Sequence, residues 1–178
     1  MRIPLLAVVF STAALAGAPF SVTSTSIHEG KPLGDAQVAN TFGCTGGNLS
    51  PQLAWKNAPA GTKSFAVTVY DPDAPTGSGW WHWQLYDIPA TVTSLAEGIG
   101  PKAEVPAGAK AGPNDGGGHE FMGACPPQGD KPHHYIVTVF ALKVETLGVQ
   151  DGASAAMIGF MLHANTLAKA KVTGTYKR

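Results

Sequence analysis

Short alternating apolar segments, separated by clusters of glycine and proline, constrain the fold of this 178-residue chain more than any other feature. Residues 64–70 carry little charge on either face, which is typical of a central strand buried on both sides. Strands are also predicted over residues 20–27, 53–55, 81–88, 135–143 and 170–176. The 22 glycines and 14 prolines follow no repeat period, so we interpret them as turns between these strands.

One helix is predicted, over residues 151–167, with Asp151 or Ser154 as its N-cap. Six apolar residues recur there at helical spacing, and we expect them to form a stripe packed on the core. These residues are Ala153, Met157, Phe160, Met161, Ala164 and Leu167. Many short strands and one late helix predict a mainly β fold, a β-sandwich with helical additions. We find no internal repeat and no second domain, so residues 17–178 are expected to form a single domain.

The N-terminal segment predicts export. Met1-Arg2 supplies a positive end, an apolar run follows, and Ala14-Leu15-Ala16 fits the small-x-small rule for cleavage before Gly17. The run is shorter than the ~20 residues of a membrane-spanning helix, which favours a cleaved signal peptide, residues 1–16, over an anchor or a buried first strand. No cysteine follows the run, which argues against a lipoprotein. We therefore expect a periplasmic or secreted protein without a transmembrane segment in its mature part.

The charge pattern gives no support for nucleic-acid binding. The 12 basic and 12 acidic side chains balance, and no basic stripe is interleaved with aromatic residues. The cationic residues Lys169, Lys171, Lys177 and Arg178 are interpreted as a solvated edge and not as a binding patch.

The two cysteines, Cys44 and Cys125, favour a disulfide, because an even count in an oxidising compartment usually means pairing. The alternative is two separate buried thiols. A bond between positions 81 apart (125 − 44) would stabilise the fold by ~4 kcal/mol on the chain-entropy model.

Two acids follow the predicted strand over residues 64–70. Asp71 and Asp73 flank Pro72, which cannot donate to a strand ladder, so the strand stops and both acids enter a loop. A single short acid is often only a turn-former. A segment rich in tryptophan and histidine follows within ten residues, so we assign Asp71 to a pocket and keep Asp73 as a possible second contributor.

His82 is the first histidine candidate for that pocket. It lies between Trp81 and Trp83, so strand alternation places His82 on one face and both tryptophans on the other. Trp80 shares the parity of His82 and could form the rim of the pocket. A lone histidine in a strand is usually structural, so this assignment depends on a second histidine.

His133 is that second histidine. It precedes a strong predicted strand, and Tyr135 shares its parity. Together with Asp71 and His82 they could converge into a cluster suited to an oxyanion such as phosphate, because imidazoles donate hydrogen bonds and a neighbouring acid favours their cationic form. His134 has the opposite parity and is expected at the surface.

Two loops complete the candidate site. Cys125-Pro126-Pro127 predicts a rigid extended backbone, and the N–H donors of Gly123 or Ala124 would be free to point into a cavity. Residues 98–118 are dense in glycine and proline, and so long a loop usually means function or mobility. No role is assigned to His119.

Taken jointly, these motifs resemble the phosphatidylethanolamine-binding protein family, also called the Raf kinase inhibitor protein family. Asp71-Pro72-Asp73-Ala74-Pro75 is similar to the first family signature, residues 80–83 to its tryptophan-x-histidine element, and residues 123–135 to its second signature. Residues 44–51 and 151–155 look like the bacterial YbhB/YbcL branch. The resemblance covers almost all of the mature chain.

The resemblance implies a two-sheet antiparallel β-sandwich with a small anion pocket for phosphate-like groups, phospholipid headgroups or phosphorylated partners. The residues that it places in or near the pocket are Asp71, Asp73, Trp80, His82, Cys125, Pro126, His133 and Tyr135, to which we add Gly123. One departure is Phe121, at a position where the family commonly has an aromatic hydroxyl.

We therefore expect an exported, non-enzymatic protein that binds a small anionic ligand through a phosphate-type or carboxylate group, without a cofactor. It could also inhibit or modulate a partner protein. The alternative is a hydrolase or metal-dependent enzyme using Asp73, His82 and His133, residues sufficient in type for zinc. A nucleophilic site would need an activated serine or cysteine, but Gly-x-Ser-x-Gly is absent and Ser50 precedes a proline, so the binding protein is favoured.

Overall fold

Two β-sheets form the framework of the protein in the computed structural model, which describes residues 17–100 and 104–178. The smaller sheet has the strand order β1-β3-β6 and the larger has the order β2-β9-β8-β4-β5-β7. The smaller sheet contains β1 (Ser21–Thr23), β3 (Leu53–Lys56) and β6 (Ser94–Leu95). The larger contains β2 (Lys31–Pro32), β4 (Ser64–Asp71), β5 (Trp80–Pro89), β7 (Lys110–Ala111), β8 (His133–Leu142) and β9 (Thr166–Tyr176). A 3-10 turn, η1 (Asp35–Gln37), and the helix α1 (Ala155–Asn165) complete the described elements.

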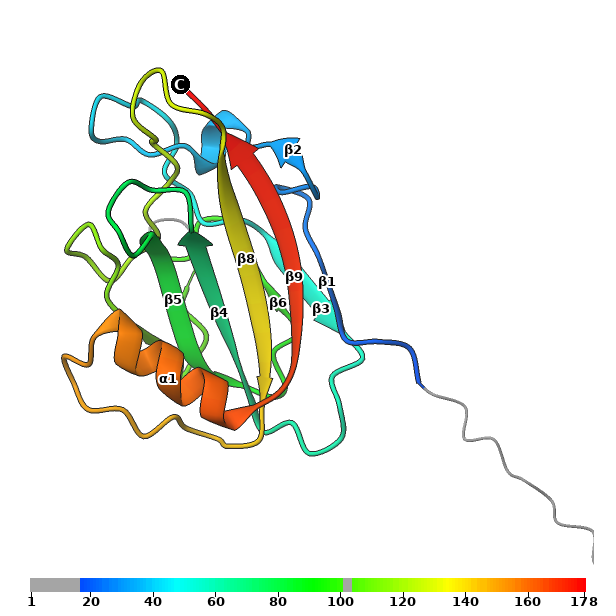
Figure 1. Ribbon diagram of the computed structural model, residues 1–178. Helices are drawn as coiled ribbons and strands as arrows, with labels where there is room; N and C mark the ends of the chain where they lie inside the picture. Colours follow the sequence, from blue (N-terminus) through cyan, green and yellow to red (C-terminus); the bar gives the residue numbers. More distant parts are fainter. Residues whose placement is uncertain (1–16, 101–103) are drawn as a thin grey trace, which may run out of the picture.

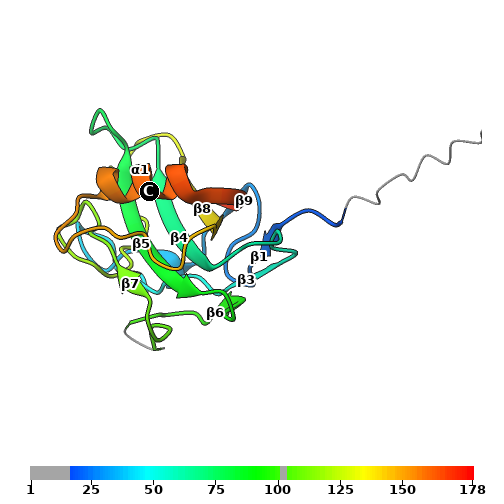
Figure 2. The same ribbon diagram turned by 90° about the horizontal axis from the view of Figure 1, so that it is seen from below.

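The elements are stacked in three layers (Figures 1 and 2). The small sheet packs on one face of the large sheet, and α1 lies across the other face. The main core fills the space between the sheets, where Leu53 and Trp55 of β3 meet Phe65 and Val67 of β4. A second core lies under α1, where Ile158 and Leu162 join a cluster with the large sheet. Strand β4 is therefore covered on both faces, as its apolar sequence predicted.

The strands of the large sheet are paired antiparallel, except at one edge. β4 pairs with β5 and β8, and β8 pairs with β9, each in antiparallel register. β2 instead runs parallel to β9, a pairing of two residues. The mainly β, two-sheet architecture is confirmed, and this short parallel edge is a local departure from the expected antiparallel pattern.

The helix is shorter than predicted, and its exposed face was misassigned. It spans Ala155–Asn165, and the Ser154 hydroxyl caps it by accepting a hydrogen bond from the Met157 N–H at 3.2 Å. The predicted core stripe is wrong, because Phe160 is 67% exposed and Met157 51%. Ile158 and Leu162 face the sheet instead. Residues 166 and 167 already belong to β9.

The first predicted strand is also shorter, for a local reason. β1 ends at Thr23, and the Ser24 hydroxyl then accepts hydrogen bonds from the N–H groups of Ser26 and Ile27, at 3.0 Å each. Such a side-chain turn competes with strand pairing. The predicted long loop of residues 98–118 contains the short strand β7, which pairs with β5.

Over residues 17–100 and 104–178, none of the helices combines the length and the apolar character that a bilayer crossing needs. The predicted signal peptide, residues 1–16, lies outside the described residues.

Candidate functional site

A pocket lies at one end of the large sheet, where two strands end and two begin. β4 ends at Asp71, opposite Trp80 at the start of β5, and β9 ends at Tyr176, opposite His133 at the start of β8. Because neighbouring strands run antiparallel, the end of one lies beside the start of the next. A cavity of about 310 Å³ opens at this end of the sheet. Its lining residues are Phe42, Asp71, Ala74, Pro75, Thr76, Trp80, His82, Met122, Gly123, Cys125, Pro126, Pro127, His133, Tyr135 and Arg178.

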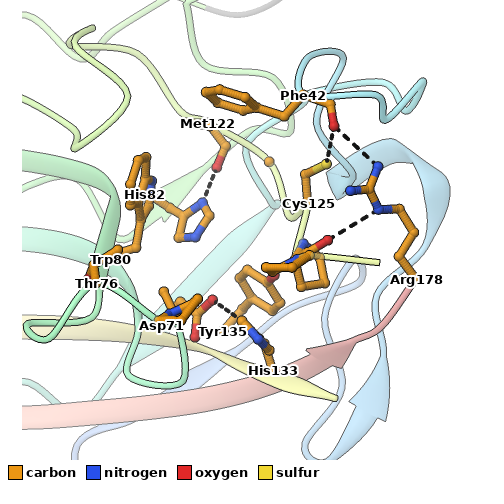
Figure 3. Close-up of a pocket in the computed structure, with 15 residues that line it drawn as sticks. Phe42, Asp71, Thr76, Trp80, His82, Met122, Cys125, His133, Tyr135 and Arg178 are labelled. Atoms are coloured by element: carbon orange, nitrogen blue, oxygen red, sulfur yellow. Dashed lines mark hydrogen bonds and ion pairs between the residues drawn. The ribbon is translucent and has the colours of Figure 1, made fainter. Parts of the chain in front are cut away.

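A buried acid–histidine pair forms one wall of the pocket (Figure 3). The Nδ1 atom of His133 lies 2.7 Å from a carboxylate oxygen of Asp71, and both side chains are almost fully buried. The other Asp71 oxygen accepts a hydrogen bond from the Asp73 N–H at 2.8 Å. The Nε2 atom of His133 lies 3.3 Å from a carboxylate oxygen of Asp130. Since carboxylates only accept, both contacts are hydrogen bonds when the ring carries two protons, and His133 is then a cation between two acids.

His82 faces the same pocket with a different hydrogen-bond pattern. Its Nδ1 atom lies 2.8 Å from the backbone carbonyl oxygen of Met122. A carbonyl can only accept, so Nδ1 carries the proton and donates. Burial lowers the pKa of His82 below its ordinary value, against the opposing effects of the Met122 carbonyl and the Asp71 charge. Near neutral pH His82 is therefore a neutral ring, with its Nε2 atom unprotonated.

Tyr135 and Trp80 bring further donors to the site. The rings of Tyr135 and His82 contact edge to face, with centroids 5.1 Å apart. Burial raises the pKa of Tyr135 above its ordinary value, with a smaller contribution from Asp71, so its hydroxyl stays protonated. Trp80 lines the cavity, and its buried indole N–H has no hydrogen-bond partner within the described residues.

A disulfide joins two of the loops around the pocket. Cys44 and Cys125 are bonded, with Cα atoms 6.0 Å apart. The backbones of the same loops are also joined, because Ala39 N–H donates to Ala124 O and Ala124 N–H donates to Gln37 O, both at 3.0 Å. The loop of residues 39–48 is therefore held against the segment of residues 123–127 by both covalent and hydrogen bonds.

The expectation of free backbone donors at this segment is wrong. Gly123 N–H donates to the side-chain oxygen of Asn48 at 2.7 Å, and Ala124 N–H is used by Gln37. Both amides form hydrogen bonds with segments that are distant in the sequence, so the sequence alone could not predict these contacts. Gly123 still lines the cavity, and a Cβ atom there would lie 2.5 Å from the backbone nitrogen of Ala39.

Of the nine predicted pocket residues, eight line the cavity and Asp73 does not. Its carboxylate accepts hydrogen bonds from Lys131 at 2.8 Å and from His134 Nδ1 at 2.6 Å. These partners, Lys131 foremost, hold the pKa of Asp73 well below its ordinary range. The set Asp73, His82 and His133 is therefore not assembled into one metal site, and no group of three potential metal-ligating side chains occurs in the described residues.

Sequence reasoning missed two residues at the pocket mouth. Arg178 was assigned to a solvated edge, but it lines the cavity and donates from Nε to Pro126 O and from Nη1 to Phe42 O, at 3.2 Å each. Phe42 is 64% exposed at the rim and has a positive φ of 51°. No strand periodicity marks either residue, because both lie outside regular elements; the turn residues beside Phe42 were the only signal.

Three further residues that the sequence analysis considered lie outside the cavity. The His134 side chain is 54% exposed, in agreement with its parity. Phe121 is buried against Trp83, edge to face, and does not line the pocket. His119 contacts the Ala111 carbonyl at 3.1 Å on the exposed surface, away from the cavity.

The fold and site define a mainly β protein with a solvent-open pocket at strand ends, which both apolar and polar side chains line. The chain belongs to the phosphatidylethanolamine-binding protein family: the family model described as phosphatidylethanolamine-binding protein matches residues 23–177.

Relatives support this membership over most of the chain. YbcL of Escherichia coli K12 is 53% identical over 170 residues, which cover 94% of this chain and 93% of YbcL. The crystal structure of E. coli YbcL superposes with a TM-score of 0.87 at 54% identity, over 90% of this chain and 99% of that one. YbhB of E. coli K12 is 46% identical over 154 residues, which cover 86% of this chain and 97% of YbhB. LppC of Mycobacterium tuberculosis, which is named as a lipoprotein, is 33% identical over 169 residues, which cover 94% of this chain and 77% of LppC.

Proposed function

We propose that this protein is an exported, non-enzymatic binding protein whose pocket takes a small anion, such as a phosphate-type headgroup or a phosphorylated or carboxylate ligand. The observation that carries the proposal is the convergence of Asp71, His82, His133 and Tyr135, from three strands, on one open cavity. Small-molecule sites are typically concave and largely apolar, with a few convergent polar groups. The family name, which refers to phosphatidylethanolamine, is in keeping with such a ligand.

The charges near the cavity favour an anion. The Arg178 guanidinium lies at the mouth of the cavity, and a guanidinium is always protonated in proteins. The Tyr135 hydroxyl is held in its protonated form and has no hydrogen-bond partner among the described residues, so it is free to donate to a ligand. These groups supply the positive potential and the donor that an anion needs.

A binding role, and not catalysis, fits the state of the potential nucleophiles. Covalent catalysis needs a hydroxyl or thiol next to a base. Cys125 is bonded to Cys44, and the Thr76 hydroxyl donates to the Gly79 carbonyl at 2.5 Å. Neither side chain is paired with a ring nitrogen of His82 or His133, whose contacts are with Met122 and the acids.

Export is supported by two observations on the chain and its relatives. Disulfides persist in oxidising compartments, and the described residues contain two cysteines, both in the Cys44–Cys125 bond. LppC, a relative that is similar to this chain over most of its length, is named as a lipoprotein. We therefore assign the protein to the periplasm or the extracellular space.

The direct test is calorimetric titration of the purified protein with phosphate, O-phosphoethanolamine and acetate, repeated on Tyr135→Phe. The variant keeps the buried ring and removes only the hydroxyl that faces the ligand. Loss of a hydrogen bond to a charged group costs ~1.5 kcal/mol, so affinity should fall about tenfold. Tyr86→Phe, which removes a hydroxyl under α1, is the control and should leave affinity unchanged. Absence of binding by every anion would overturn the proposal.

A further inference from the structure

The hydrogen-bond polarity of His82 restricts which anion the pocket can accept. The Met122 carbonyl fixes the proton on Nδ1, at 2.8 Å, so Nε2 of the neutral ring is an acceptor and not a donor. Figure 3 shows the second ring nitrogen turned away from Met122, toward the side of the cavity where Asp71 and Tyr135 lie. The edge-to-face contact with Tyr135 holds the ring in this orientation.

The surroundings of His82 do not reverse this polarity. The backbone of Met122 and Gly123 favours the cationic ring through hydrogen bonds, and the charges of Asp71 and Asp115 favour it as well. Burial opposes them and is the larger effect. From β8, Tyr135 presents a neutral hydroxyl and His133 is turned to its acids, while Arg178 binds the carbonyls of Pro126 and Phe42.

A fully deprotonated anion therefore meets acceptors on two sides of the pocket floor. The Asp71 carboxylate and the His82 Nε2 atom both offer lone pairs, and neither has a proton to give. An anion that also carries an O–H group can satisfy both kinds of partner. It accepts from the Tyr135 hydroxyl and donates to Nε2 of His82.

We propose that the pocket selects an anion that keeps a proton, namely a phosphate monoester in its monoanionic form, whose P–O–H group donates to His82. This inference rests on the proposed anion-binding function and narrows it to one class of ligand. A sulfate ester has the same shape but no such proton. A phosphodiester, as in an intact phospholipid headgroup, has no ionisable P–O–H either. The pocket therefore favours a free or terminal phosphate monoester over the headgroup of an intact phospholipid.

Methyl phosphate and methyl sulfate form the matched pair of probes. At about pH 5.5 both are mostly monoanions of similar size, because the second pKa of a phosphate monoester is about 6. They differ at that pH in one proton. We expect calorimetric titration of the wild-type protein to give at least tenfold tighter binding of methyl phosphate, and dimethyl phosphate should resemble methyl sulfate. Equal affinity for methyl phosphate and methyl sulfate would overturn the inference while leaving anion binding intact.

The pH dependence gives a second readout on the same protein. Above about pH 6 the free monoester loses its proton, so binding requires proton uptake and the affinity should fall about tenfold per pH unit. Titrations in buffers of different ionisation enthalpy should show close to one proton taken up at about pH 8. Binding of methyl phosphate that stays constant up to pH 8 without proton uptake would contradict the inference.

The proton acceptor is identified by His82→Gln, with circular dichroism to establish that the variant is folded. A glutamine amide can turn either its oxygen or its N–H toward the ligand, so the preference for methyl phosphate over methyl sulfate should shrink to within about threefold. An unchanged preference would remove His82 from this role. In the wild-type protein, nitrogen-15 NMR should find His82 protonated on Nδ1 alone near neutral pH, whereas an Nε2–H ring would overturn the argument without any variant. If none of the three probes binds, the proposed function itself fails.

Discussion

Two neighbouring histidines at the start of β8 make similar contacts in different environments. His133 bonds Asp71 at 2.7 Å with 1% of its side chain exposed, and His134 bonds Asp73 at 2.6 Å with 54% exposed. Removing one partner of a buried pair leaves an uncompensated charge, whereas an exposed pair is screened by water. Strand alternation buries the His133 side chain and exposes that of His134, so we expect His133 to contribute more to stability.

We expect His133→Ala to lower the free energy of unfolding by about 3 kcal/mol, because it leaves the Asp71 carboxylate buried without its hydrogen-bond partner at 2.7 Å. His134→Ala, one position along the same strand, is the matched control and should cost less than about 1 kcal/mol. Urea denaturation monitored by tryptophan fluorescence measures both. Equal losses for the two variants would contradict the burial argument.

His82 makes stability depend on pH. Its pKa in the folded protein lies below the ordinary value of 6.5, mainly because the ring is buried. As pH falls below about 6.5, the unfolded chain binds a proton that the folded chain does not, so the free energy of unfolding decreases. We expect this decrease between about pH 7 and pH 5 in the wild-type protein and a smaller one in His82→Gln. Parallel pH profiles for the two proteins would show that another group is responsible.

At the residue scale, strand parity predicted many of the residues that line the pocket, but it could not predict contacts between residues distant in the sequence. The alternation around His82 and Tyr135 predicted side chains that do line one cavity, because a strand projects its side chains with a fixed period of two. Asp73 could not be placed this way, since its partners Lys131 and His134 come from residues far along the chain. The use of the Gly123 amide by Asn48 has the same long-range origin.

At the scale of elements, α1 marks where sequence periodicity fails. Apolar residues occur almost all round this helix, so a stripe can be drawn on more than one face. The position of the large sheet decides which side is buried, and it selects Ile158 and Leu162. The elements themselves were well predicted for the long strands, because β4 and β8 are apolar on both faces and lie between two layers.

Two substitutions on α1 test this assignment of its faces. Ile158→Ala should lower the free energy of unfolding by about 3 kcal/mol, because it leaves a cavity between the helix and the sheet. Phe160→Ser, two positions away and 67% exposed, should change it by less than about 0.5 kcal/mol. Thermal and urea denaturation of both variants are the measurements. A larger loss for Phe160→Ser than for Ile158→Ala would mean that the helix is turned the other way.

At the scale of the whole molecule, the disulfide closes a loop of 81 positions. On the chain-entropy model, its removal by the double substitution Cys44→Ser and Cys125→Ser should lower the free energy of unfolding by about 4 kcal/mol. The hydrogen bonds that join the same two loops should keep the folded variant native-like. Reductant should destabilise the wild-type protein by a similar amount and leave the double variant unaffected. A wild-type protein insensitive to reductant under denaturing titration would argue against the bond.

The pocket also has a consequence for how the protein is prepared and assayed. Its walls come from segments between Phe42 and Arg178, so no short fragment of the chain contains the site. Contacts between distant segments form late in folding, because loop closure must come first. A ligand of the cavity can therefore bind only to chains whose distant segments have come together. The number of sites found by titration is then a direct measure of the fraction of a preparation that has completed folding.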